Sequence, residues 1–142
     1  MSQLNNLVKI STQFIQNKLS NNSNEQTYEF TRTYTFEERT IESSRVLQKY
    51  PDRIPIICEK NSRANDCPEI DKKKYLVPHD LTMGQFMYVI RKRLKLQSEE
   101  AIFLFINGTI PSSSSLVGNI YAQYKDKDGF LYITYAKENT FG

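Results

Sequence analysis

The chain has 142 residues, of which 39% are hydrophobic and 25% are charged, and its formal net charge at pH 7 is +3. This composition is ordinary for a soluble globular protein, and it excludes both a wholly disordered chain and a dedicated nucleic-acid binder of high basic density. No apolar run approaches the ~20 residues of a membrane-spanning helix. With two cysteines and no secretory signal, we expect a reduced, intracellular protein whose membrane association is peripheral or covalent.

Residues 1–27 differ from the rest because they are rich in Asn, Gln and Ser and contain neither Pro nor Gly. Apolar residues nevertheless recur there at helix-like spacing; they are Leu4, Leu7, Val8, Phe14, Ile15 and Leu19. Residues 20–26 are typical of a linker. Only two lysines and no arginine precede them, which argues against a transit peptide. We therefore predict a flexible or conditionally helical extension over 1–27, a domain over 28–137 and a flexible tail over 138–142.

The pattern becomes regular from Phe36 onwards. Apolar spacing and two acids in the first turn predict a helix over 36–49, which Pro51 stops. Residues 54–59 predict a strand in which Pro55 marks an edge or the strand start. Residues 74–77 predict a second short strand, and the lysines before it are typical of an exposed sheet edge.

The second half of the chain predicts a long helix and two further strands. Thr82 or Asp80 can cap a helix whose last turn is rich in basic residues. The apolar run 101–106 predicts a buried strand, and Asn107-Gly108 predicts a hairpin turn after it. Helical spacing over 116–124 and a final strand over 130–135 complete an order that indicates a two-layer α+β fold of the β-grasp type.

The residues that could support catalysis or metal binding are few. Cys58 lies in an apolar strand, where packing is the expected role of a cysteine. His79, the only histidine in the sequence, follows a strand end and is expected at the surface. Two scattered cysteines and one histidine do not have metal-site spacing, and the five glycines form no phosphate-binding loop. We expect no enzyme activity, no metal and no cofactor.

Two binding functions remain open from the residues themselves. Basic residues stand near tyrosines at 72–75 and 88–95, but nucleobase stacking needs exposed aromatic rings, and most aromatic residues here occupy core positions. We therefore expect no nucleic acid as a partner. The strand at 74–77 could instead accept an extended peptide along its edge, with alternate side chains lining pockets on either side.

Several ordered motifs carry a resemblance to a known family. They are Tyr-Pro-Asp-Arg-Ile-Pro-Ile-Ile-Cys-Glu-Lys at 50–60, Ile-Asp-Lys-Lys-Lys-Tyr-Leu-Val-Pro at 70–78, Leu-Thr-Met-Gly-Gln-Phe at 81–86, Ile-Arg-Lys-Arg-Leu at 90–94, and the stretches 128–135 and 138–142. Together they resemble the autophagy ubiquitin-like modifiers, the family of microtubule-associated light chain 3 and the GABA-receptor-associated protein, and they lean towards the latter branch. The resemblance implies an α+β fold, the ubiquitin-like β-grasp with two additional N-terminal helices, near 28–34 and at 36–49.

The resemblance also implies a recognition mode. Partners, the cargo receptors and adaptors, carry an aromatic residue, two variable residues and then Leu, Ile or Val, often with acids nearby, and this motif adds as a strand against residues 72–77. The pocket for the aromatic residue corresponds to Glu42, Val46, Pro55, Ile57, Lys74, Leu76 and Phe130. The pocket for the aliphatic residue corresponds to Tyr75, Val77, Pro78, Leu81, Phe86 and Val89. The contacts to acidic residues correspond to Lys72 and Lys73, with Lys74, and to Arg93.

Gly142 corresponds to the glycine that members of this family use for conjugation. The resemblance implies activating and conjugating enzymes that pass its carboxylate to phosphatidylethanolamine, and a cysteine protease that processes or releases the modifier. The protein would then be cytoplasmic, and on autophagosome or vesicle membranes when lipidated. The alternative is a non-conjugated peptide-binding module of vesicle or cytoskeletal traffic.

Overall fold

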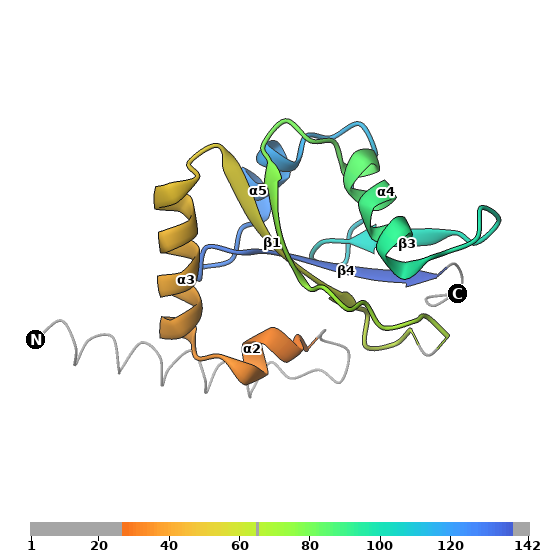
Figure 1. Cartoon of the computed structure of the whole chain (residues 1–142), viewed down its shortest axis with the longest axis horizontal. Helices are drawn as coiled ribbons and strands as arrows, with labels where there is room; N and C mark the ends of the chain where they lie inside the picture. The colour runs from red at the N-terminus through yellow and green to blue at the C-terminus, as the bar shows by residue number, and fades with distance from the viewer. Residues whose placement is uncertain (1–26, 65, 138–142) are drawn as a thin grey trace, which may run out of the picture.

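The computed structural model describes residues 27–64 and 66–137, so the predicted helix before residue 20, the predicted linker and the tail at 138–142 lie outside the described residues. Along the described chain, two helices are followed by two strands, and helices and strands then alternate (Figure 1). The elements are α2 (Glu29–Thr33), α3 (Phe36–Lys49), β1 (Arg53–Lys60), β2 (Lys74–Pro78), α4 (Met83–Leu94), β3 (Ile102–Phe105), α5 (Val117–Tyr124) and β4 (Leu131–Lys137). Each element predicted within this part of the chain is present, with ends that differ by at most two residues.

The strands of the described residues form one four-stranded sheet in the order β2-β1-β4-β3. β1 pairs antiparallel with β2 and parallel with β4, and β3 pairs antiparallel with β4. The first and last strands of the described residues, β1 and β4, thus lie side by side in the middle of the sheet, which leaves β2 at one edge, as its lysines predicted.

Pro55 does not mark an edge, because β1 is an inner strand. Pairing between β1 and β4 begins only at Ile56 and Leu131, one residue after Pro55. The N–H group of Cys58 donates to the carbonyl of Lys73 in β2, at 2.8 Å. By alternation the nitrogen of Pro55 points to the β4 side, before that ladder starts, so its missing N–H costs no sheet hydrogen bond.

The run at 101–106 is not the fully buried strand that its continuous apolar sequence predicted. β3 is an edge strand, with Ile102 and Leu104 buried and Phe103 and Phe105 only half-buried. The predicted turn after it is present, since Asn107 and Gly108 have φ angles of 49° and 75°. These positive values are those of a two-residue hairpin turn, but it closes on a single bridge and leads into no further strand.

Side chains alternate between the two faces of the sheet and make two clusters. The larger cluster lies under α4 and α5 and includes Ile56, Phe86, Ile90 and Ile133. The smaller one lies on the other face, under the two N-terminal helices, and consists of Phe30, Ile57 and Phe130, with Tyr132 packed against it. The sheet is therefore covered on both faces (Figure 1).

Side chains cap the two longer helices. Thr82, and not Asp80, caps α4 in a reciprocal pair with Gln85, and Thr35 caps α3 in the same way with Glu38. No helix among the described residues has the length and apolar character needed to cross a membrane.

Candidate functional site

The candidate site starts at the outer edge of β2, which pairs with no other strand among the described residues. Lys73 faces β1 through its carbonyl, so alternation points the peptide groups of Lys74 and Leu76 away from β1. Pro78, which has no N–H, ends this edge. Two residues of β2 thus present donors and acceptors that an added strand could pair with.

One face of β2 carries the residues of the predicted aromatic pocket. Leu76 is registered with Pro55, and Lys74 with Ile57, so these four residues lie together on the α3 side of the sheet. Glu42 on α3 accepts from Lys74 Nζ at 2.7 Å. The half-buried Val46 follows Glu42 by one helical turn and completes the α3 wall.

Burial divides the predicted aromatic pocket into a floor and walls. Ile57 is fully buried and Phe130 is 3% exposed, and both belong to the cluster beneath α2 and α3. They form a floor rather than a contact surface. The half-buried side chain of Leu76 and the exposed side chain of Lys74 are the parts that a ligand could reach.

The opposite face of β2 carries Tyr75 and Val77 of the predicted aliphatic pocket, both buried, whereas Pro78 alternates to the same face as Leu76. Tyr75 packs edge-on against Phe86 with ring centroids 5.5 Å apart, and both are buried. Leu81 is half-buried and Val89 is 39% exposed. The accessible apolar surface on this side therefore comes from Leu81 and Val89.

The same surface continues into a shallow open depression of about 570 Å³ on α4, which the predicted pockets did not include. Leu81 and Val89 line it together with Thr82, Gly84, Gln85, Tyr88, Ser113 and Ser114. Tyr88 is 59% exposed. Its position outside the apolar stripe of α4 was the signal in the sequence that could have indicated this depression. Ser113 and Ser114 carried no such signal, because a loop distant in the chain brings them here.

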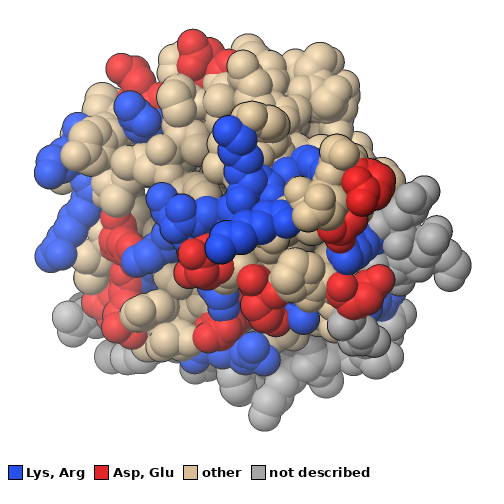
Figure 2. Space-filling view, turned by 45° about the vertical axis from the view of Figure 1, so that its right-hand side comes forward, with Lys and Arg blue, Asp and Glu red and all other residues tan. Residues whose placement is uncertain are grey.

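Basic side chains border the edge strand, and each one implicated by the sequence already has a contact within the chain. Lys73 pairs with Glu29 of α2, Lys74 with Glu42, and Arg93 Nε with Asp71 at 3.1 Å. Lys72 Nζ lies 5.2 Å from the centre of the Tyr75 ring. Figure 2 shows Lys and Arg side chains gathered across the middle of one face of the molecule, with acidic side chains beside them.

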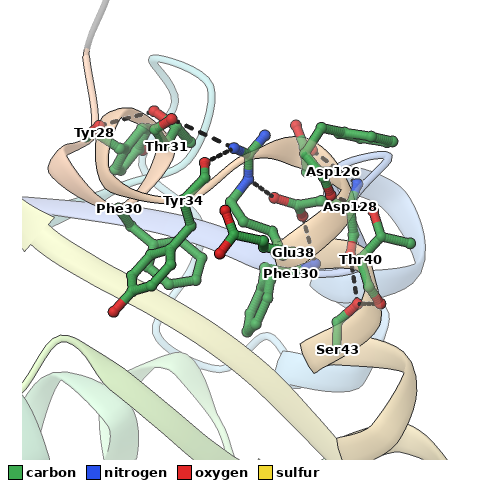
Figure 3. A network of polar contacts seen from close by, with 12 residues as sticks. Tyr28, Phe30, Thr31, Tyr34, Glu38, Thr40, Ser43, Asp126, Asp128 and Phe130 are labelled. Carbon is green, nitrogen blue, oxygen red and sulfur yellow. Dashed lines mark hydrogen bonds and ion pairs between the residues drawn. The ribbon is translucent and has the colours of Figure 1, made fainter. Parts of the chain in front are cut away.

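A buried polar network holds α3 in place against the sheet (Figure 3). Asp128, which is fully buried, accepts from Arg39 Nε at 2.8 Å, from the backbone N–H of Phe130 at 2.9 Å and from the hydroxyl of Tyr132. Arg39 also donates to the carbonyl of Tyr34 at 2.6 Å. Burial, and next the hydrogen bond to Asp128, raise the pKa of Tyr132, so its hydroxyl stays protonated and donates. The network fixes the helix that carries Glu42 and Val46.

The network requires a glycine at position 129. Its φ is +94°, a value that favours glycine, and a Cβ there would collide with Ser43 Oγ. Ser43 Oγ itself donates to the carbonyl of Asp128. Arg39 and Ser43 lie more than 80 residues from Asp128 along the chain, so no local pattern in the sequence predicted this network.

Cys58 is buried and His79 is exposed, as the sequence predicted. Cys58 is fully buried, and burial raises the pKa of its thiol, so it is not a reactive thiolate. His79 is exposed at the end of β2. Within the described part of the chain, no three His, Cys, Asp or Glu residues are grouped in a way that could hold a metal ion.

Comparisons with known proteins agree with this geometry. The family described as "Autophagy protein Atg8 ubiquitin like" matches residues 38–142. Autophagy-related protein 8 of Pichia angusta is 60% identical over 114 residues, which cover 80% of this chain and 90% of that protein. Autophagy-related protein 8 of Saccharomyces cerevisiae (strain YJM789) is 58% identical over 113 residues, which cover 80% of this chain and 96% of that protein.

The fold is also that of a solved relative. The crystal structure of Trypanosoma brucei ATG8 matches with a TM-score of 0.77 and 46% identity, over 82% of this chain and 100% of that chain. This match confirms the predicted α+β fold, a ubiquitin-like β-grasp with two additional N-terminal helices, which are α2 and α3. The extent of these matches places the chain in the Atg8 family of ubiquitin-like autophagy proteins.

Proposed function

We propose that this protein is a modifier that is conjugated through Gly142 to phosphatidylethanolamine on autophagosomal membranes and recruits partners at the edge of β2. Family membership supports the first part, since the match to the family extends to residue 142. The geometry of β2 supports the second. The chain supplies a carboxylate and a binding groove, and the catalytic groups belong to the activating and conjugating enzymes and to the cysteine protease.

The chemistry of a terminal glycine suits such a transfer. Its carboxylate attacks ATP and releases pyrophosphate to form an acyl adenylate, and a thiolate of the activating enzyme then displaces AMP to form a thioester. A thiolate of the conjugating enzyme displaces the first thiolate, and the amine of the lipid head group displaces the second thiolate to form an amide. Glycine has no Cβ, so each nucleophile and each narrow enzyme cleft meets little obstruction. The two acyl chains of the lipid then provide a firm anchor for a protein that was cytoplasmic before conjugation.

The observation that carries the groove proposal is the placement of two apolar surfaces on opposite faces of one free strand edge. An aromatic residue and an aliphatic residue three positions later point to opposite faces of an extended peptide. Leu76 lies on the α3 face of β2, and Leu81 and Val89 lie on the α4 face. A peptide paired with Lys74 and Leu76 would therefore direct one anchor to each surface.

This arrangement also sets the direction of the peptide. The aromatic surface lies around Lys74 and Leu76, nearer the start of β2, and the aliphatic surface lies around Pro78 and Leu81, at its end. The motif has its aromatic residue first, so the peptide runs parallel to β2. Acids that precede the aromatic residue then face Lys72 and Lys73.

Leu76→Ala tests the groove. We expect this change to weaken binding of a peptide that carries a Trp-x-x-Leu motif by about 1–3 kcal/mol, or roughly five- to 150-fold in Kd, because it removes an apolar contact for the aromatic anchor. Isothermal titration calorimetry measures the affinity, and thermal unfolding checks that the fold is retained.

Ile110→Ala is the matched control. Ile110 is 56% exposed in the loop after β3, outside the groove, so its loss removes a similar apolar side chain without touching the peptide. Equal affinity of Leu76→Ala and the wild-type protein would contradict the assignment of this edge as the binding groove.

A further inference from the structure

Lys73 is held by a carboxylate of the same chain. Its Nζ forms an ion pair with Glu29, the first residue of α2, and the side chains are 30% and 61% exposed. The hydrogen bond and the charge of Lys73 lower the pKa of Glu29, so this carboxylate is ionised at neutral pH. The pair lies next to the start of the edge strand β2.

The fold positions Glu29 for this contact. The buried carboxylate of Glu59 on β1 accepts from the backbone N–H groups of Glu29 and Phe30, at 2.8 and 3.0 Å. The Phe30 ring then packs edge-on against Phe130, with centroids 5.2 Å apart. These hydrogen bonds fix the first turn of α2 against the sheet. Glu29 is therefore held near Lys73, and their ion pair costs little conformational entropy.

The neighbouring lysine, Lys74, also forms an ion pair with a carboxylate of the same chain. Glu42 of α3 pairs with Lys74 at 2.7 Å. Burial lowers the pKa of Lys73, but the hydrogen bond to Glu29 and the charges of Glu59, Glu29 and Glu69 together raise it. The basic end of the groove is therefore partly neutralised by the protein's own acids before any partner binds.

We propose that Glu29 is a specificity-determining residue that competes with the acids of a partner peptide for Lys73. This inference rests on the proposed function of the β2 edge. A carboxylate of an acidic peptide must displace that of Glu29 from Lys73. The binding free energy gained at Lys73 is therefore the difference between two ion pairs and not the full value of one. The groove consequently favours partners whose acids are numerous or well placed, and it gives little advantage to a single acid.

Glu29→Gln tests the inference by removing the competing charge while keeping the size of the side chain. Two synthetic peptides share a Trp-Ala-Ala-Leu core and carry either three glutamates or three glutamines before it. We expect Glu29→Gln to tighten binding of the glutamate peptide by about two- to fivefold, the range of an exposed ion pair, and to leave the affinity of the glutamine peptide unchanged.

Glu37→Gln is the matched control for net charge. Glu37 is exposed in the first turn of α3, and the same change there alters the total charge equally without freeing Lys73. Circular dichroism and thermal unfolding check that α2 stays folded in Glu29→Gln. A gain with Glu37→Gln as large as that with Glu29→Gln would mean that net charge acts, and would overturn the inference.

A double-mutant cycle with Lys73→Gln tests whether the tighter binding depends on the Glu29–Lys73 ion pair. In the Lys73→Gln background, Glu29→Gln should leave the affinity for the glutamate peptide unchanged, because there is no cation left to release. A persistent gain there, or equal tightening of both peptides, would overturn the proposed competition. If the wild-type protein binds neither peptide, the groove itself is wrong and the inference fails with it, whereas binding that Glu29→Gln leaves unaltered removes only the inference.

Discussion

Gly142→Ala is expected to slow conjugation to phosphatidylethanolamine on the order of a hundredfold or more, because a misplaced acyl group in an enzyme cleft costs about that much. In the proposed transfer, the added Cβ would be next to the carbonyl that two thiolates and an amine attack in turn. The measurement is incubation with the family's activating and conjugating enzymes, ATP and liposomes that contain phosphatidylethanolamine. Intact mass and flotation with the liposomes report the conjugate.

Asn139→Ala is the control for this experiment, because it changes the same tail without altering the acyl donor. Wild-type rates of conjugation for Gly142→Ala would contradict the role of this residue. If the wild-type protein is not conjugated by enzymes that modify another family member, the protein is a free peptide-binding module, and the groove experiments still apply to it.

Asp128→Ala is expected to lower the free energy of unfolding by about 3–5 kcal/mol, the cost of leaving one partner of a buried ion pair alone. Asp128 is fully buried and the Arg39 side chain is 12% exposed, so water cannot replace the lost carboxylate easily. The N–H of Phe130 and the hydroxyl of Tyr132 lose an acceptor as well. Urea unfolding measures the change.

Asp71→Ala provides the comparison for Asp128→Ala. It breaks the pair with Arg93, whose side chains are 74% and 45% exposed, and should cost less than about 1 kcal/mol. Similar losses for both variants would mean that burial of the Arg39 pair adds no stability. Since Asp128 holds the helix that carries Glu42 and Val46, its loss should also weaken peptide binding, even at temperatures where the protein remains folded.

Local patterns in the sequence were sufficient for most elements of the fold. The apolar run of β1 and the apolar stripe of α4 depend on residues that are neighbours in the chain, and so does the Thr82 cap with Gln85. The edge position of β2 was also readable, because lysines before a short strand are a local signature. The motifs at 50–60 and 70–78 were collinear with a known family, and the comparisons confirmed that membership.

Local pattern failed where neighbours in space decide the environment. The continuous apolar run at 101–106 predicted a buried strand, but burial depends on what covers each face, and β3 lies at the edge with two phenylalanines half-buried. Pro55 predicted an edge or strand start by its missing N–H, yet the staggered start of β4 allows it in an inner strand.

The sequence by itself determined the order and type of the elements of the domain, its family, and the apolar and basic residues along β2. Only the tertiary structure showed that Leu76 and Leu81 lie on opposite sides of the β2 edge, and that hydrogen bonds among Arg39, Ser43 and Asp128 hold α3 against the sheet. It also showed that Glu29 holds Lys73. Each of these contacts joins residues far apart in the chain. Such contacts depend on how the helices and strands pack together, and the periodicity of a single segment gives no information about that packing.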